Sequence, residues 1–111
     1  MHQPEIILQK RDQLFELCHQ FGVKVLFAFG SVVSNQFDPE KSDLDFLVEM
    51  EEMSPLERGE NLIGLWEALE ALFARKVDLI TNQPIKNPYL RDSIERSKLL
   101  IYDRESEKVF V

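Results

Sequence analysis

The strongest constraint on this chain is a pair of aspartates at the start of one predicted strand. A Gly-Ser turn precedes them, at the end of the predicted strand before. An apolar run over Val23–Phe29 leads into Gly30 and Ser31, and a second strand opens with Asp43 and Asp45. Side chains at positions i and i+2 of a strand point to the same face, so the two carboxylates would aim at one point. Hard divalent cations take carboxylate oxygens, and the Gly-Ser turn resembles a phosphate cradle. Together these features predict a site for a metal-bound nucleoside triphosphate.

The rest of the chain alternates predicted helices and strands. Apolar residues recur at helical spacing through residues 3–21, and Gly22 is placed to end that helix. A short helical turn and a loop are expected over 32–42, and further strands are expected at 43–49, 76–81 and 98–102. Short connections between these elements predict an α/β (α+β) fold with a mixed sheet of about four strands and helices packed on it. Residues 1–111 are expected to form one domain, with 103–111 as a tail that frays or docks on the body or on a partner.

Two helices are predicted from their capping residues. Ser54 is a predicted N-cap, with Pro55 at N1 and Glu57 at N3 closing a capping box. Asn87 and Pro88 repeat this pattern and predict a helix to about Ser97. The first of these helices should end near Ala74 and bury Leu56, Ile63, Trp66, Leu69, Leu72 and Phe73. Its glycines, Gly59 and Gly64, either weaken it or permit close packing.

Composition limits the classes of partner. The formal net charge of −7 argues against stand-alone binding to nucleic acid, which depends on basic groups at phosphates. A single cysteine, Cys18, excludes an internal disulfide and is predicted to be a core residue of a cytoplasmic protein. Charged residues from Glu5 to Asp12 interrupt any N-terminal apolar run, so no signal peptide is expected. No apolar stretch approaches membrane-spanning length, so no membrane association is expected.

A third aspartate, Asp78, lies within the apolar run Val77–Ile80. An aspartate in a buried strand is costly unless it has a partner. One interpretation is that Asp78 bonds to a helix N-terminus or to Arg75. The other places it on a strand beside Asp43 and Asp45, where it would complete a three-carboxylate metal site. Each observation is weak alone, but the ordered set of strand-Gly-Ser, strand-Asp-x-Asp and strand-Asp is much more specific.

This ordered set resembles the nucleotidyltransferase superfamily of the DNA polymerase β type, whose signature is Gly-Ser, a spacer, Asp-x-Asp and a later strand aspartate. The short chain and its C-terminal stretch, KNPYLRDSIERSKLLIYD, further resemble minimal nucleotidyltransferase (MNT) domains. These domains are the antitoxins paired with HEPN ribonuclease toxins in prokaryotic two-gene modules. The resemblance covers the chain from the first helix to about Asp103.

The resemblance implies a role for each matching residue. Gly30, which has no Cβ, would let the backbone approach the phosphates, and Ser31 would offer its hydroxyl and N–H at a helix N-terminus. Asp43 and Asp45 would hold two Mg²⁺ ions, and Asp78 would share the ion that activates the attacking hydroxyl. The implied reaction transfers AMP from ATP to a tyrosine hydroxyl of the HEPN toxin and so silences it.

One position departs from the MNT pattern, because Val32-Val33 follows Ser31 where many members have a basic residue. The missing charge would weaken triphosphate binding unless Lys41, Arg75 or Lys76 supplies it. A second function therefore stays open. The protein could be a non-catalytic antitoxin that occludes its toxin, with the apolar tail Val109–Val111 as an interface strip.

Other candidate sites are weaker. His2 and His19 are too few and too far apart in the sequence for a zinc site. Trp66 lies at helical core spacing, which predicts a core residue rather than a stacking platform. The Asp-x-Asp pair is not a calcium loop, because the glycine and the later glutamate of an EF-hand are absent.

Overall fold

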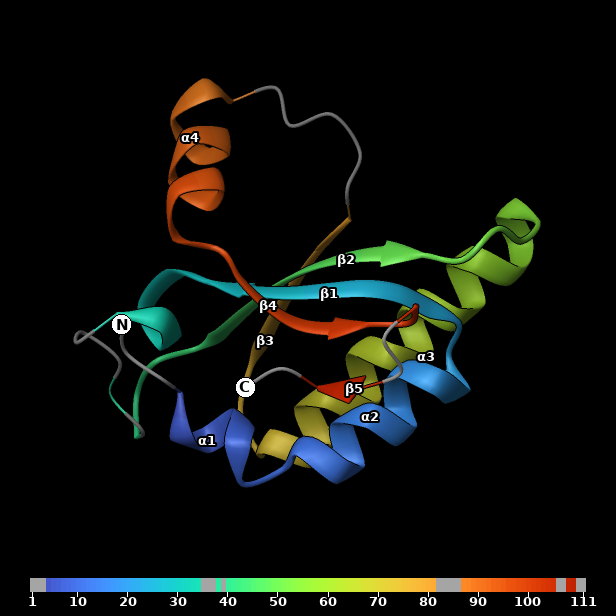
Figure 1. The fold of residues 1–111 in the computed structure, drawn as a ribbon, viewed down its shortest axis with the longest axis horizontal. Helices are drawn as coiled ribbons and strands as arrows, with labels where there is room; N and C mark the ends of the chain where they lie inside the picture. The colour runs from blue at the N-terminus through green and yellow to red at the C-terminus, as the bar shows by residue number, and fades with distance from the viewer. Residues whose placement is uncertain (1–3, 35–37, 39, 82–86, 106–107, 110–111) are drawn as a thin grey trace.

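The computed structural model describes residues 4–34, 38, 40–81, 87–105 and 108–109 (Figure 1). Along these residues the elements are α1 (Glu5–Leu8), α2 (Arg11–Gln20), β1 (Val23–Phe29), the 3₁₀ helix η1 (Gly30–Val33), β2 (Leu44–Met50), α3 (Pro55–Phe73), β3 (Val77–Thr81), α4 (Pro88–Ser97), β4 (Leu99–Asp103) and β5 (Lys108–Val109). This alternation confirms the predicted α/β class. Within the described ranges, no helix combines the length and the apolar character needed to cross a membrane.

The strands form one mixed sheet in the order β3-β2-β1-β4-β5. The central strand β1 is antiparallel to both β2 and β4, whereas β2 and β3 are parallel. The parallel pair needs a crossover connection, and the long helix α3 provides it. The fifth strand is the two-residue β5, which pairs with β4 and extends the predicted set of about four. It lies in the predicted tail, of which residues 106–107 and 110–111 are outside the described residues.

Helices cover both faces of this sheet (Figure 1). Helices α2 and α3 lie on one face, where Cys18 and Leu69 join a core with Leu26, Phe46 and other strand residues. Helix α4 lies on the opposite face, where its Ile94 packs in a second, smaller cluster with Phe29 and Leu47. Cys18 is fully buried as predicted, and burial raises the pKa of its thiol to about 12. The thiol is therefore a core group.

The predicted helix over 3–21 is divided in two. Helix α1 ends at Leu8 and α2 begins at Arg11. The Lys10 N–H donates to the carbonyl of Ile7, three residues back, which tightens the turn and ends the α-helical pattern. Lys10 itself has a non-helical backbone, with φ −113°. The end of α2 follows the prediction more closely, because Gly22 comes after it with φ +72°.

Helix α3 buries only part of the predicted set of apolar residues. Leu69 and Phe73 are buried together with Leu65, and Leu72 is partly buried. By contrast, the prediction was wrong for three residues, because the exposed fractions are 73% for Leu56, 59% for Ile63 and 42% for Trp66. Strand β3 is at the edge of the sheet, so none of the described strands covers this flank of the helix.

The N-terminus of α3 is capped as predicted. The Glu57 N–H donates to Ser54 Oγ at 3.2 Å, and Ser54 Oγ in turn donates to Glu57 Oε1 at 3.0 Å. We expect Ser54→Ala to lower the free energy of unfolding by about 1 kcal/mol, because the N–H loses its acceptor. Urea unfolding would measure this change, with Ser93→Ala on the exposed face of α4 as the control. Equal unfolding midpoints for the two variants would contradict the prediction.

Candidate active site

Asp45 and Asp78 lie directly side by side on neighbouring strands. The parallel ladder between β2 and β3 pairs Asp45 with Asp78 in register. Their neighbours Leu44, Phe46 and Val77 point into the core beneath α2 and α3. Side chains alternate along a strand, so the two aspartates point to the opposite face, on which α4 lies. The sequence could place both residues on strands, but this pairing comes from the parallel register.

The two carboxyl groups interact strongly. Asp45 is partly buried and shares a hydrogen bond with Asp78, which requires a proton on one of the two groups. Burial raises the pKa of Asp45 from 3.8 to about 6, and the hydrogen bond and the negative charges of Asp78 and Asp43 act in the same direction. Asp78 is exposed because β3 is an edge strand, so the expectation that it is buried was wrong. The pair is a point of unbalanced negative charge near neutral pH.

Gly30 adjoins this pair from the end of β1. Its φ is +76°, a left-handed conformation that side chains disfavour. A Cβ on Gly30 would also overlap Oδ2 of Asp45. The glycine therefore brings the turn after β1 against the carboxylate, which no larger residue would permit. Ser31 follows in η1 and is partly buried, and its carbonyl accepts from the N–H and the Oγ of Ser34.

Asp43 lies outside the tight pair. It immediately precedes β2 and is partly buried, and its charge helps to raise the pKa of Asp45. Among the described residues, no group of three or more acidic, histidine or cysteine side chains is arranged to hold a metal ion. The structure therefore brings Asp45 and Asp78 together and leaves Asp43 nearby. The metal-binding roles of the three residues stay predictions.

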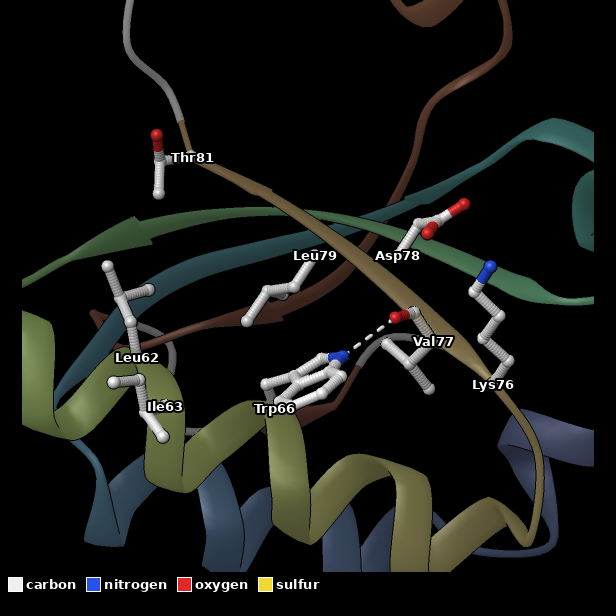
Figure 2. A pocket seen from close by; sticks show the side chains of 8 residues that line it. All are labelled: Leu62, Ile63, Trp66, Lys76, Val77, Asp78, Leu79 and Thr81. Atoms are coloured by element: carbon white, nitrogen blue, oxygen red, sulfur yellow. Dashed lines mark hydrogen bonds between the residues drawn. The ribbon is translucent and has the colours of Figure 1, made fainter.

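The three basic residues named from the sequence differ in their surroundings. Arg75 donates from Nη1 to the carbonyl of Ser42 at 3.1 Å, so it fastens the segment that leads into Asp43. Lys76 is exposed and extends on the same side of β3 as Asp78 (Figure 2). Lys41 is exposed in the turn before β2. Arg75 thus has a positioning role, and Lys76 is the basic side chain that Figure 2 shows beside Asp78.

Sequence reasoning missed a contact between α3 and the outer edge of β3. The Trp66 Nε1–H donates to the carbonyl of Val77 at 2.9 Å, and the Val77 N–H donates to Glu70 Oε2 at 2.9 Å. Figure 2 shows Trp66 across a groove from Leu79, with Asp78 at its margin. Trp66 is therefore a half-exposed edge residue, and the prediction that it is a core residue was wrong. The indole N–H was the available signal, because a tryptophan near a surface seeks an acceptor.

The raised pKa of Asp45 makes the stability of the protein depend on pH. The folded state holds this proton up to about pH 6, whereas the unfolded chain loses it near 3.8. Asp45 therefore lowers stability progressively as pH rises between these values. We expect the melting temperature of Asp45→Asn to exceed that of wild type at pH 7 and the difference to disappear near pH 4. Thermal scans against pH would measure it, and a less stable variant at pH 7 would contradict it.

The fold and this sequence pattern define a class of protein. The chain belongs to the nucleotidyltransferase domain family, which it matches over residues 10–101. It is 38% identical over 96 residues to a Methanocaldococcus jannaschii protein named “Putative protein adenylyltransferase”, covering 86% of this chain and 90% of that one. It is 40% identical over 72 residues to the protein adenylyltransferase MntA of Thermococcus cleftensis, covering 65% of this chain and 69% of that one.

Solved structures share the same fold. A “putative minimal nucleotidyltransferase” matches with a TM-score of 0.67 and 31% identity, over 88% of this chain and 95% of that one. A chain of the complex between the tri-AMPylated HEPN toxin of Shewanella oneidensis and its MNT antitoxin matches with a TM-score of 0.54 and 16% identity, over 90% of this chain and 75% of that one. At that identity the second likeness concerns the fold alone. The predicted family and fold are thus both confirmed.

Proposed function

We propose that this protein is an Mg²⁺-dependent AMP transferase that acts as an antitoxin in the cytoplasm. It would transfer AMP from ATP to a tyrosine hydroxyl of a HEPN-type toxin and thereby neutralise that toxin. The observation that carries the proposal is the in-register pair of Asp45 and Asp78 against Gly30, in a chain of the nucleotidyltransferase family. The names of the relatives support AMP transfer to a protein, and the fold shared with a toxin–antitoxin complex supports the class of partner.

The donor set fits Mg²⁺. Asp45, whose pKa is raised to about 6, lies beside the carboxyl group of Asp78, and a cation placed there would relieve the repulsion between them. Asp43, Asp45 and Asp78 would together hold two ions, since carboxylate oxygens are preferred ligands of hard cations. When bound, Mg²⁺ would supply positive charge that lowers the pKa of the acceptor hydroxyl and stabilises the departing pyrophosphate.

The residues of the chain would orient the reactants. Gly30 has no Cβ and so brings the turn after β1 against Oδ2 of Asp45, where its backbone would lie beside a phosphate of the bound nucleotide. Ser31 would add its hydroxyl and N–H as donors to the phosphate oxygens. In the reaction, the acceptor oxygen forms a bond to the α-phosphorus of ATP. The bond that breaks joins this phosphorus to the oxygen between the α- and β-phosphates. Pyrophosphate and the hydroxyl proton leave.

Mg²⁺ with ATP should stabilise the folded protein. A ligand that binds only the native state at about a hundred times its dissociation constant adds about 2.7 kcal/mol to the free energy of unfolding. We expect a rise in melting temperature of several degrees with Mg-ATP, and little change with ATP and a chelator or in Asp43→Asn. An unchanged melting temperature at saturating Mg-ATP would overturn the proposed nucleotide site.

A second candidate function is neutralisation by occlusion without catalysis. Two observations favour it: Val32 is buried where many MNT domains have a basic residue, and no three-carboxylate cluster is preformed among the described residues. The substitution Asp43→Asn distinguishes the two functions. This variant would lose protection against the toxin if AMP transfer is required, and would keep it if occlusion is sufficient.

A further inference from the structure

Strand β3 forms one edge of the sheet. The backbone N–H and C=O groups of its successive residues point alternately toward β2 and away from it. The carbonyl of Lys76 accepts from the Leu44 N–H at 3.1 Å, so Lys76, Asp78 and Ile80 turn their backbone groups toward β2. Val77 and Leu79 therefore turn theirs toward the outer edge. Such an edge is a template for another strand unless something covers it.

Helix α3 covers only the first half of this edge. Both outward groups of Val77 are bonded to α3 side chains, the N–H to Glu70 and the carbonyl to Trp66. Leu79 lies two residues further along β3. No described side chain is bonded to its backbone N–H or carbonyl. Within the described ranges, Leu79–Thr81 thus form a short open edge that α3 does not close.

Apolar side chains line the groove beside this open edge. Leu62, Ile63 and Trp66 of α3 face Leu79 across a groove of about 360 Å³ (Figure 2). Ile63 is 59% exposed and Trp66 42% exposed, which is costly surface to leave in water. Asp78 lies at the margin of the same groove and is hydrogen-bonded to Asp45. Asp78 therefore belongs both to the lining of the groove and to the candidate active site.

We propose that an extended segment of the acceptor protein binds here as an added strand, paired with the backbone of Leu79–Thr81. Successive side chains of an added strand point to opposite faces. An apolar residue of the segment would pack on Ile63 and Trp66, and the next residue, which carries the acceptor hydroxyl, would face Asp78. This inference rests on the proposed function and specifies its substrate as a tyrosine with apolar neighbours in an extended segment.

The site favours an extended segment over other occupants. A helix could cover the apolar wall but would leave the backbone groups of Leu79 unpaired, because a helix bonds its own backbone. A segment with basic flanks also suits a protein with 20 acidic and 13 basic side chains. A second copy of this chain, with the same net charge of −7, would be repelled.

Trp66 is the single tryptophan of the chain, so its fluorescence reports binding in the groove directly. The probe is a short synthetic peptide with one tyrosine between valines and a lysine at each end. The first comparison peptide has glutamates in place of the valines, and the second carries N-methyl groups on the backbone beside the tyrosine. We expect the valine peptide to shift Trp66 emission saturably and to bind at least about tenfold more tightly than either comparison peptide.

Two serine substitutions on α3 form a matched pair. Ile63 lines the groove, whereas Leu56 is 73% exposed on the same helix and does not. We expect Ile63→Ser to raise the dissociation constant of the valine peptide about tenfold and Leu56→Ser to change it less than about twofold. Equal affinity for the three peptides, or equal effects of the two substitutions, would overturn the inference. A wild-type dimer that Ile63→Ser converts to monomer would also overturn it, because a second copy would then occupy the groove.

The titration needs no ATP, so it separates this inference from the proposed function. Groove-dependent peptide binding without AMP transfer to any acceptor would support the docking site and overturn the enzymatic proposal. If Ile63→Ser instead transfers AMP to the valine peptide with an undiminished kcat/KM, the enzymatic proposal is supported and the docking site is overturned.

Discussion

Asp45→Asn is expected to lower the rate of AMP transfer at least about a thousandfold, since charge stabilisation by a bound metal contributes several kcal/mol to such a transition state. An amide keeps the shape of the carboxyl group but removes the charge that would hold Mg²⁺. The same change should raise the melting temperature at pH 7, because it removes a carboxylate whose pKa is raised by burial and by repulsion from Asp78 and Asp43. Loss of activity together with a gain in stability is the signature of a site residue in a strained electrostatic environment.

Pyrophosphate release, measured beside thermal unfolding, would test both effects in one set of samples. Asp92→Asn is the matched control, because Asp92 is an exposed aspartate on α4. Activity within tenfold of wild type in a folded Asp45→Asn variant would contradict the assignment of Asp45 to the site. A variant that is both inactive and unfolded would instead mark Asp45 as a structural residue.

Gly30→Ala is expected to impair both folding and catalysis. The φ of +76° imposes a strain of about 1–2 kcal/mol on any residue with a Cβ. The added methyl group would also overlap Oδ2 of Asp45, so that either the turn after β1 or the carboxylate must move. The rate of AMP transfer should therefore fall by more than the loss of stability explains, because the displaced carboxylate belongs to the candidate site.

Gly59→Ala is the control for this substitution. Gly59 lies within α3, and a Cβ there would meet no other atom within 4 Å. Alanine favours a helix over glycine by up to about 1 kcal/mol, so this variant should be more stable than wild type and equally active. Urea unfolding and activity assays of the two variants would distinguish the positions. Equal stability of the two would contradict the close approach of Gly30 to Asp45.

The strands and the helix caps could be predicted from the sequence because local chemistry determines them. The apolar run Val23–Phe29 forms β1 over the predicted residues, and Ser54 and Asn87 cap their helices with side-chain oxygens. The relation between Asp45 and Asp78 could not be predicted in the same way. It depends on a parallel pairing across the crossover through α3, which no local pattern specifies.

The exposed flank of α3 could not be predicted from the sequence for a related reason. Apolar residues occur on more than one side of this helix, and only the position of β3 at the sheet edge decides which of them are covered. Leu65 and Leu69 face the sheet, whereas Ile63 and Trp66 lie beside the open edge. The apolar stripe therefore predicted the helix correctly and its buried residues only in part.

Transfer of label from α-labelled ATP tests the central proposal most directly. The protein would be incubated with Mg²⁺, labelled ATP and the co-expressed product of its neighbouring gene, beside Asp43→Asn. We predict label on a tyrosine of the partner protein, absent with the variant and accompanied by loss of toxin activity. A partner that is bound and inhibited but carries no label would contradict AMP transfer and establish neutralisation by occlusion.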